Sequence, residues 1–198
     1  MLDKREHLLQ SALPLFIEQG FHGTSVQAIV RAAGVATGSF YRYFDSKEAL
    51  ISALFRQVLA HMCTLITAGV DLQQVCFASY RQMWLNACDG IRDHADVMFY
   101  KDLYERSPYF TTADQVWAHQ QWAPLNDFFR RGREQGVFRD LPPMLLGTLS
   151  LASVQCVLHE RRFYDFELTD AVKAQLAEAS WQAILAATSS DTTCGSKE

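Results

Sequence analysis

The sequence is short of proline, of paired cysteines and of long apolar runs, and each shortage excludes a class of protein. Only 5 of the 198 residues are proline and 49% are hydrophobic, which excludes a polar disordered chain. The 5 cysteines lie far apart, with no CxxC pair and no zinc-ligand spacing, so we expect neither a disulfide framework nor a metal site. No run approaches about eighteen consecutive apolar residues, and charged residues occupy the N-terminus where a signal peptide would be apolar. We therefore expect a globular, cytoplasmic protein with no membrane partner.

Catalytic signatures are missing as well. The 6 histidines are scattered, no HExxH sequence occurs, and no glycine-rich loop follows a strand-like segment. The sequence therefore predicts a protein that is not an enzyme and uses no cofactor. Among the cysteines only Cys88 has basic residues nearby, and a buried inert thiol explains it better than an oxidant sensor.

The chain also lacks an excess of positive charge. The formal net charge is −4, which taken alone argues against nucleic-acid binding. Residues 1–50 nevertheless carry 5 bases and 5 acids, whereas the rest of the chain carries 13 bases and 17 acids. Because the acidity lies in the C-terminal part, a neutral N-terminal module can still present a local basic face to DNA.

Helical periodicity dominates what remains. Apolar residues recur at intervals of three and four, and the strict alternation typical of strands is nearly absent, so the predicted fold class is all-α. Gly20 and Gly34 stop the first two helices, and Thr24 with Gln27 forms a capping box at the start of the second. The predicted helices span about residues 3–19, 24–33, 37–44, 46–67, 72–89, 93–105 and 112–135, one that begins at 142 or 143, and 169–187.

Residues 24–50 contain the most informative pattern. Two short helices joined by a tight glycine-containing turn form a helix-turn-helix unit, whose second helix lies in the major groove of DNA. Gly34 supplies the turn here, and Ile29 and Phe40 are expected to pack the two helices together. The second helix has few apolar residues and many short polar ones, which suits a helix that faces DNA.

These residues resemble the TetR family of transcriptional regulators. The family pattern combines a threonine that begins a helix, an Ala-Gly-Val turn, a G-x-x-Y-x-Y-F stretch and a K-x-x-L start to the next helix. The resemblance implies an N-terminal three-helix DNA-binding domain, joined through a long fourth helix to a helical C-terminal domain that binds a ligand and dimerises. The matching residues are Thr24, Ala33, Gly34, Val35, Gly38, Tyr41, Tyr43, Phe44, Lys47 and Leu50.

The resemblance implies contacts to DNA phosphates at four positions. Thr24 is expected to bind a phosphate through its hydroxyl and the free N–H groups of its helix start. Lys47 would add a positive charge there, and Tyr41 would reach a phosphate with its phenol. Arg42 would touch either a phosphate or a guanine.

The resemblance also implies which residues read the bases. Thr37, Ser39 and Tyr43 are the candidates for base edges or thymine methyl groups, and Gly38 would permit close approach of the backbone. Ala36 stands where the family often has serine, so the recognition helix lacks its usual cap hydroxyl unless Thr37 replaces it.

Large aromatic side chains are abundant in the C-terminal part. Most such rings fill the core of a helical bundle, but their number, together with several methionines, favours a cavity for an apolar or aromatic effector. The candidate lining residues are Tyr80, Trp84, Phe99, Tyr104 and Trp117.

Small residues are frequent in the last two predicted helices, where they would let helices approach closely. The resemblance implies that these two helices pair with those of a second subunit, and packing against the helix over 112–135 is the alternative. The predicted organisation is a DNA-binding domain over residues 1–48, a ligand-binding and dimerisation domain over 49–187, and a disordered tail over 188–198.

The sequence therefore predicts a homodimeric repressor that leaves a palindromic operator when a small effector binds. A helical ligand-binding protein without DNA binding is the first alternative, and an enzyme is the second. The identities of the effector and operator, and the choice between repression and activation, stay open at this point.

Overall fold

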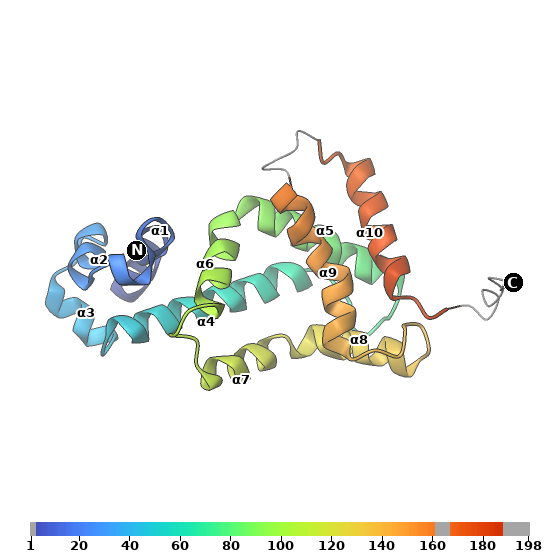
Figure 1. The fold of residues 1–198 in the computed structure, drawn as a ribbon, viewed down its shortest axis with the longest axis horizontal. Coiled ribbons are helices and arrows are strands. Elements are labelled where there is room, and N and C mark those ends of the chain that lie inside the picture. Colours follow the sequence, from blue (N-terminus) through green and yellow to red (C-terminus); the bar gives the residue numbers. More distant parts are fainter. Residues whose placement is uncertain (1–2, 161–166, 188–198) are drawn as a thin grey trace, which may run out of the picture. The chain divides into compact units, whose positions relative to one another are not determined.

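The computed structural model describes residues 3–160 and 167–187, and the regular structure in these ranges is ten α-helices (Figure 1). The all-α prediction is confirmed. Phe138 and Leu185 form an isolated antiparallel bridge. The tail predicted over residues 188–198 lies outside the described ranges. The helices are α1 (Lys4–Gly23), α2 (Val26–Ala32), α3 (Thr37–Tyr43), α4 (Lys47–Thr67), α5 (Phe77–Asp93), α6 (Ala95–Glu105), α7 (Thr112–Gln121), α8 (Ala123–Glu134), α9 (Pro143–Glu160) and α10 (Asp170–Ile184).

The helices divide into two compact units. The first unit consists of Met1–Cys63 and Ile91–Gln121, and the second consists of Thr64–Gly90 and Trp122–Glu198. The first unit therefore holds α1 to α3, α6, α7 and most of α4, while the second holds most of α5 together with α8 to α10. The N-terminal segment that is predicted to bind DNA thus shares its unit with α6 and α7.

The single helix predicted over residues 112–135 is wrong. The structure divides it into α7, which ends at Gln121, and α8, which begins at Ala123. Pro124 explains the break, because proline has no N–H to donate to the carbonyl four residues earlier and its ring would clash with that carbonyl. In the first turn of α8 the same proline is tolerated, since N–H groups there have no partner within the helix.

Aromatic side chains hold the first unit together. Phe16 and Phe21 of α1 are buried, and their ring centroids lie 5.1 Å apart. Phe21 also meets the buried ring of Tyr100 in α6 edge-on, with 5.8 Å between centroids. The Tyr100 hydroxyl donates a hydrogen bond of 2.8 Å to the carbonyl of Ile51 in α4. These contacts fix α1 against α6 and connect α6 to α4.

Asp114 of α7 is a buried carboxylate that links α4, α6 and α7. Its oxygens accept hydrogen bonds from Ser52 Oγ at 2.8 Å, Tyr104 Oη at 2.8 Å and Thr111 Oγ1 at 2.7 Å. Arg56 Nη2 lies 3.1 Å from Asp114 Oδ1. Burial by itself would raise the pKa of Asp114, but these hydrogen bonds, led by that of Thr111, outweigh burial and lower the pKa to about 2. Asp114 is therefore ionised at every ordinary pH.

The core of the second unit is also aromatic. The ring of Phe138 lies between those of Phe128, Phe129 and Trp181, at centroid distances of 5.9, 5.9 and 5.1 Å. Gly132 of α8 makes room for it, because a Cβ atom at that position would lie only 2.1 Å from the Phe138 ring. Glycine is required here by close packing.

α4 is a long apolar helix. By length and composition alone it could cross a membrane, since an 18-residue window within it has a mean hydropathy of 1.6. In the structure 44% of that window is buried. Leu50, Ile51 and Phe55 are completely inaccessible to solvent, so core packing accounts for the apolar character of α4.

The lowered pKa of Asp114 makes stability depend on pH in a defined range. The pKa is about 2 in the folded chain against an ordinary value of 3.8, so the stabilisation is complete above about pH 4 and disappears as the pH falls toward about 2. Its size at neutral pH is about 2 kcal/mol. We expect Asp114→Asn to lower the free energy of unfolding at neutral pH, and the difference from wild type to shrink in acid. Urea denaturation at a series of pH values measures both quantities.

The matched control is Asp127→Asn, which removes an exposed carboxylate that pairs with Arg130 on the surface of α8. Such pairs contribute little to stability, so this variant should follow wild type across the range. A stability difference between Asp114→Asn and wild type that stayed constant from neutral pH to acid would contradict the assignment.

Candidate nucleic-acid interface

A tight turn joins α2 to α3. Gly34 has a φ of +64°, a conformation that favours glycine, and its N–H donates to the Arg31 carbonyl at 3.2 Å. The N–H of Val35 donates to the Val30 carbonyl at 3.0 Å, which closes the turn. Ile29 of α2 and Phe40 of α3 are both fully buried. The helix-turn-helix predicted from the sequence is therefore present, with Gly34 in the expected role.

The cap of α2 differs from the prediction by one residue. Ser25 is the N-cap, and its hydroxyl accepts a hydrogen bond of 3.1 Å from the N–H of Ala28. The capping box of Thr24 with Gln27 is therefore wrong. Both Thr24 and Ser25 are good cap residues by type, and the sequence holds no local signal that chooses between them.

Thr24 is instead a buried structural residue. Its hydroxyl, which is fully inaccessible, lies 3.0 Å from the Leu15 carbonyl and 2.9 Å from the Gly20 carbonyl, and donates to them. A hydroxyl that is buried and bonded in this way cannot reach a phosphate, so the phosphate contact expected of Thr24 does not fit this geometry. Ser25, the exposed neighbour that the sequence reasoning missed, offers the hydroxyl at the start of α2.

Lys47, the first residue of α4, closes the loop between α1 and α2. Its ammonium donates to the carbonyl of Phe21 at 2.7 Å and to the carbonyl of Thr24 at 3.0 Å. An ammonium group has three N–H donors, so two of them serve the fold. Lys47 therefore supports the helix-turn-helix unit and adds positive charge beside Ser25.

One face of α3 is exposed while the other enters the core. Phe40 faces inward, whereas Thr37, Gly38 and Arg42 are exposed and the Tyr41 side chain is 58% exposed. Tyr41 and Arg42 therefore extend from the helix into solvent. The exposed residues of α3 include four of the predicted DNA contacts, and they all lie on one short helix.

The remaining predicted contacts on α3 are half-buried. Ser39 donates its backbone N–H to the Ala36 carbonyl at 2.8 Å. Tyr43 lies at the end of α3, and its hydroxyl is 3.5 Å from Asp3 Oδ1, a long hydrogen bond to the residue before α1. Ala36 is the N-cap of α3 without any side-chain cap. The absence of a cap hydroxyl confirms the sequence prediction, and Thr37 does not replace it.

The fold of the chain does not require glycine at position 38. Its φ is not positive, and a Cβ atom at this position would meet nothing within 4 Å. Since glycine weakens a helix relative to alanine, the fold gains nothing from it. The open space above Gly38 belongs to the exposed face of α3.

The five residues predicted to bind the effector are divided between the two units. Tyr80 and Trp84 of α5 belong to the second unit and are fully buried. The Tyr80 hydroxyl lies 2.8 Å from Ser180 Oγ, and the Trp84 indole N–H donates to Ser153 Oγ at 3.2 Å. Burial raises the pKa of Tyr80 to about 12, so this hydroxyl is neutral.

Phe99, Tyr104 and Trp117 belong to the first unit, and each has a different environment. Phe99 is 44% exposed, Tyr104 is buried against Asp114, and the Trp117 ring lies 5.7 Å from the Arg56 guanidinium carbon. These three residues and Tyr80 and Trp84 are predicted to line one cavity. Neither unit contains all five.

Two family models match the chain. The model described as "Bacterial regulatory proteins, tetR family" matches residues 8–54. The model described as "Tetracyclin repressor-like, C-terminal domain" matches residues 75–185. The first match covers the helix-turn-helix unit, and the second covers the region from α5 to the end of α10.

Known proteins are similar to this chain over most of its length. An HTH-type transcriptional regulator of Haemophilus influenzae is 24% identical over 182 residues, which are 92% of this chain and 96% of that protein. The HTH-type transcriptional repressor DhaR of Mycobacterium sp. is 29% identical and covers 76% of this chain and 78% of its own length. The structure of a TetR family regulator from Vibrio parahaemolyticus has a TM-score of 0.81 at 29% identity, covering 92% of this chain and 99% of that chain.

Gly38→Ala tests whether the exposed face of α3 meets DNA. Because the new methyl group meets no protein atom, we expect the free energy of unfolding to stay level or to rise by up to about 1 kcal/mol. We expect affinity for DNA to fall by about tenfold or more, since the methyl would occupy the space where bases approach. Urea denaturation measures the first, and fluorescence anisotropy on a duplex that the wild-type protein selects from a random pool measures the second.

Gln115→Ala, on the exposed surface of α7, is the matched control and should change neither quantity. Full DNA affinity in Gly38→Ala would mean that the middle of α3 does not approach the bases.

Proposed function

This chain belongs to the TetR family of transcriptional regulators, and on that premise we propose that it is a homodimeric repressor that a small effector releases from a palindromic operator. The exposed face of α3 is the main support for the proposal. Polar side chains lie there together with a glycine that has open space above it, on a helix whose other face is buried. One such helix reads few base pairs, so two copies related by a two-fold axis are needed for a selective site.

The DNA contacts divide into two groups. Tyr41 and Lys47 bind phosphates. Ser25, in place of Thr24, binds a phosphate at the start of α2. Thr37, Ser39 and Tyr43 read base edges, and Gly38 lets the backbone approach them. Arg42, which is exposed beside Tyr41, binds a phosphate or a guanine.

The dimer interface lies on α9 and α10. Three of the six large hydrophobic residues that are most exposed in the described chain belong to α9: Met144 at 63%, Leu145 at 44% and Leu149 at 52%. Leu145 and Leu149 are four residues apart and share one face of the helix. α9 packs on α10, which exposes the small side chains of Ala179 and Ala183. Two such helices from each subunit would form a four-helix interface.

The effector acts through α4 in this proposal. α4 begins with Lys47 in the first unit and ends in the second, so it contributes residues to both. An apolar or aromatic compound held by rings such as Trp84 can shift α4, and Lys47 would move with it. By reciprocity, DNA must weaken effector binding by the factor by which the effector weakens DNA binding. The protein works in the cytoplasm, where it meets DNA.

Selection of bound duplexes from a random pool tests the proposal as a whole. We expect the wild-type protein to enrich an inverted repeat whose half-sites lie about one helical turn apart or somewhat more. Failure to retain any duplex would favour the alternative of a helical ligand-binding protein without DNA binding. An enriched sequence without a repeat would contradict the symmetric dimer.

Tyr41→Phe and Thr37→Ala separate phosphate contacts from base contacts. Tyr41→Phe removes only a phenolic hydroxyl, so we expect its affinity for all duplexes to fall by a similar factor of about 3 to 10. Thr37→Ala should instead change the order of preference among single-base variants of the selected duplex. Anisotropy titrations on a panel of variants measure both. A uniform loss in both proteins would contradict this division.

Leu149→Glu tests the dimer interface. A charged side chain in an apolar interface loses its hydration without a partner, so we expect dissociation to become at least about a hundredfold easier. Light scattering should give wild type twice the chain mass of 22.5 kDa and should give the variant the single mass at micromolar concentration. Val116→Glu, which charges an equally exposed position on α7, should remain dimeric. A monomeric wild-type protein, or a dimeric Leu149→Glu protein, would contradict the assigned interface.

A further inference from the structure

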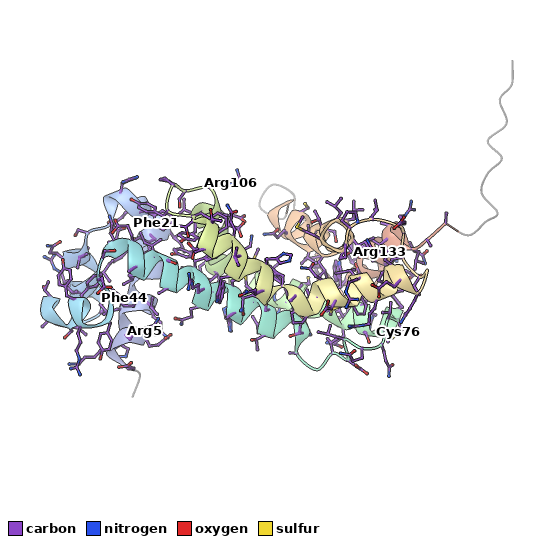
Figure 2. All side chains as sticks on the ribbon, turned by 90° about the horizontal axis from the view of Figure 1, so that it is seen from below. Arg5, Phe21, Phe44, Cys76, Arg106 and Arg133 are labelled. Carbon is purple, nitrogen blue, oxygen red and sulfur yellow. The ribbon has the colours of Figure 1, made fainter. Side chains whose placement is uncertain are left out.

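We infer that the first turn of α1 is a further DNA-contacting element, in which Arg5 binds a backbone phosphate beside the end of the recognition helix. The inference rests on the proposed DNA-binding function of α3 and adds a residue from another helix to it. Arg5 is exposed, and its guanidinium carbon lies 5.4 Å from the ring centroid of Phe44 (Figure 2). Phe44 directly follows Tyr43, the last residue of α3.

The ring of Phe44 attracts the guanidinium of Arg5. Phe44 is only 5% exposed, so the ring is itself fixed by the core. A guanidinium over an aromatic face is attracted to it, and its N–H donors lie in its own plane and stay available at the edge. The planar fork of N–H groups matches the oxygens of a phosphate. Phe44 therefore orients Arg5 without using its hydrogen-bond donors.

The acids on either side of Arg5 have other partners. Asp3 Oδ1 accepts the long hydrogen bond from the Tyr43 hydroxyl. Glu6 Oε1 accepts from Gln57 Nε2 at 2.7 Å and from Gln10 Nε2 at 3.0 Å. Arg5 itself has no ion pair within residues 3–160 and 167–187. Its N–H donors therefore have no carboxylate partner in the described part of the chain.

A base at this position matters because the helix-turn-helix unit has few. α2 and α3 contain only Arg31 and Arg42 as basic residues. Phosphate contacts supply a large share of DNA affinity, and each released counterion adds to its salt dependence. α1 packs against α3 within the first unit, and this packing keeps Arg5 near the end of α3.

The test is the salt dependence of DNA binding by the full chain, measured by anisotropy on the duplex that the wild-type protein selects. For Arg5→Ala we expect affinity to fall by about tenfold at low salt, and the slope of log affinity against log salt to decrease in magnitude by about one. The loss should be equal for every duplex, because phosphate contacts carry no sequence information. Arg5→Lys keeps the charge and should restore most of the slope.

Arg106→Ala is the matched control, because Arg106 is an exposed arginine in the turn after α6 and should contribute nothing (Figure 2). Thermal unfolding of each variant checks that the fold is unchanged. If wild type binds DNA and Arg5→Ala binds it with the same affinity and slope, the inference is wrong while the proposed function stands. If wild type retains no duplex at all, the proposed function itself fails.

Discussion

The position of α3 depends on the hydrogen bonds that close the loop between α1 and α2. The Lys47 ammonium donates to the carbonyls of Phe21 and Thr24, and the buried Thr24 hydroxyl donates back to α1. Hydrogen bonds to a charged donor are about twice as strong as neutral ones. These bonds attach α4 to the end of α1 and to the start of α2, and the turn at Gly34 then sets the direction of α3.

The sequence predicts this unit well where the signal is local. The glycine turn, the exposed polar face of α3 and the absent cap at Ala36 are all encoded within a few residues. The cap of α2 is different, because Thr24 and Ser25 are both suitable and only burial against Leu15 and Gly20 decides between them. Pro124 is a local signal too. It breaks a helix that apolar periodicity alone would continue.

Contacts between distant residues could not be predicted. Asp114 contacts Ser52 and Arg56, which lie 62 and 58 positions earlier in the sequence. An acidic residue near the start of a helix usually indicates a cap or a solvated surface, so the sequence does not reveal these contacts. The contact of Arg5 with Phe44 joins α1 to the residue that follows α3 in the same way. Aromatic richness predicts a core correctly but does not assign rings to a unit, and the five candidate effector residues are accordingly divided between the two units.

The two units of this TetR-family regulator expose different surfaces. The first unit exposes α3 and supports it through α1, α4 and α6, while the second unit packs α9 on α10 and exposes an apolar face on α9. α4 contributes residues to both units, and the proposed coupling between effector and DNA depends on this helix.

Hydrogen exchange read by mass spectrometry, with and without the duplex that the protein selects, tests the central claim most directly. The account predicts a strong slowing of exchange over residues 25–46 when DNA is bound, and only small changes over the helices of the second unit. Slower exchange confined to the second unit, with residues 25–46 unaffected, would contradict it.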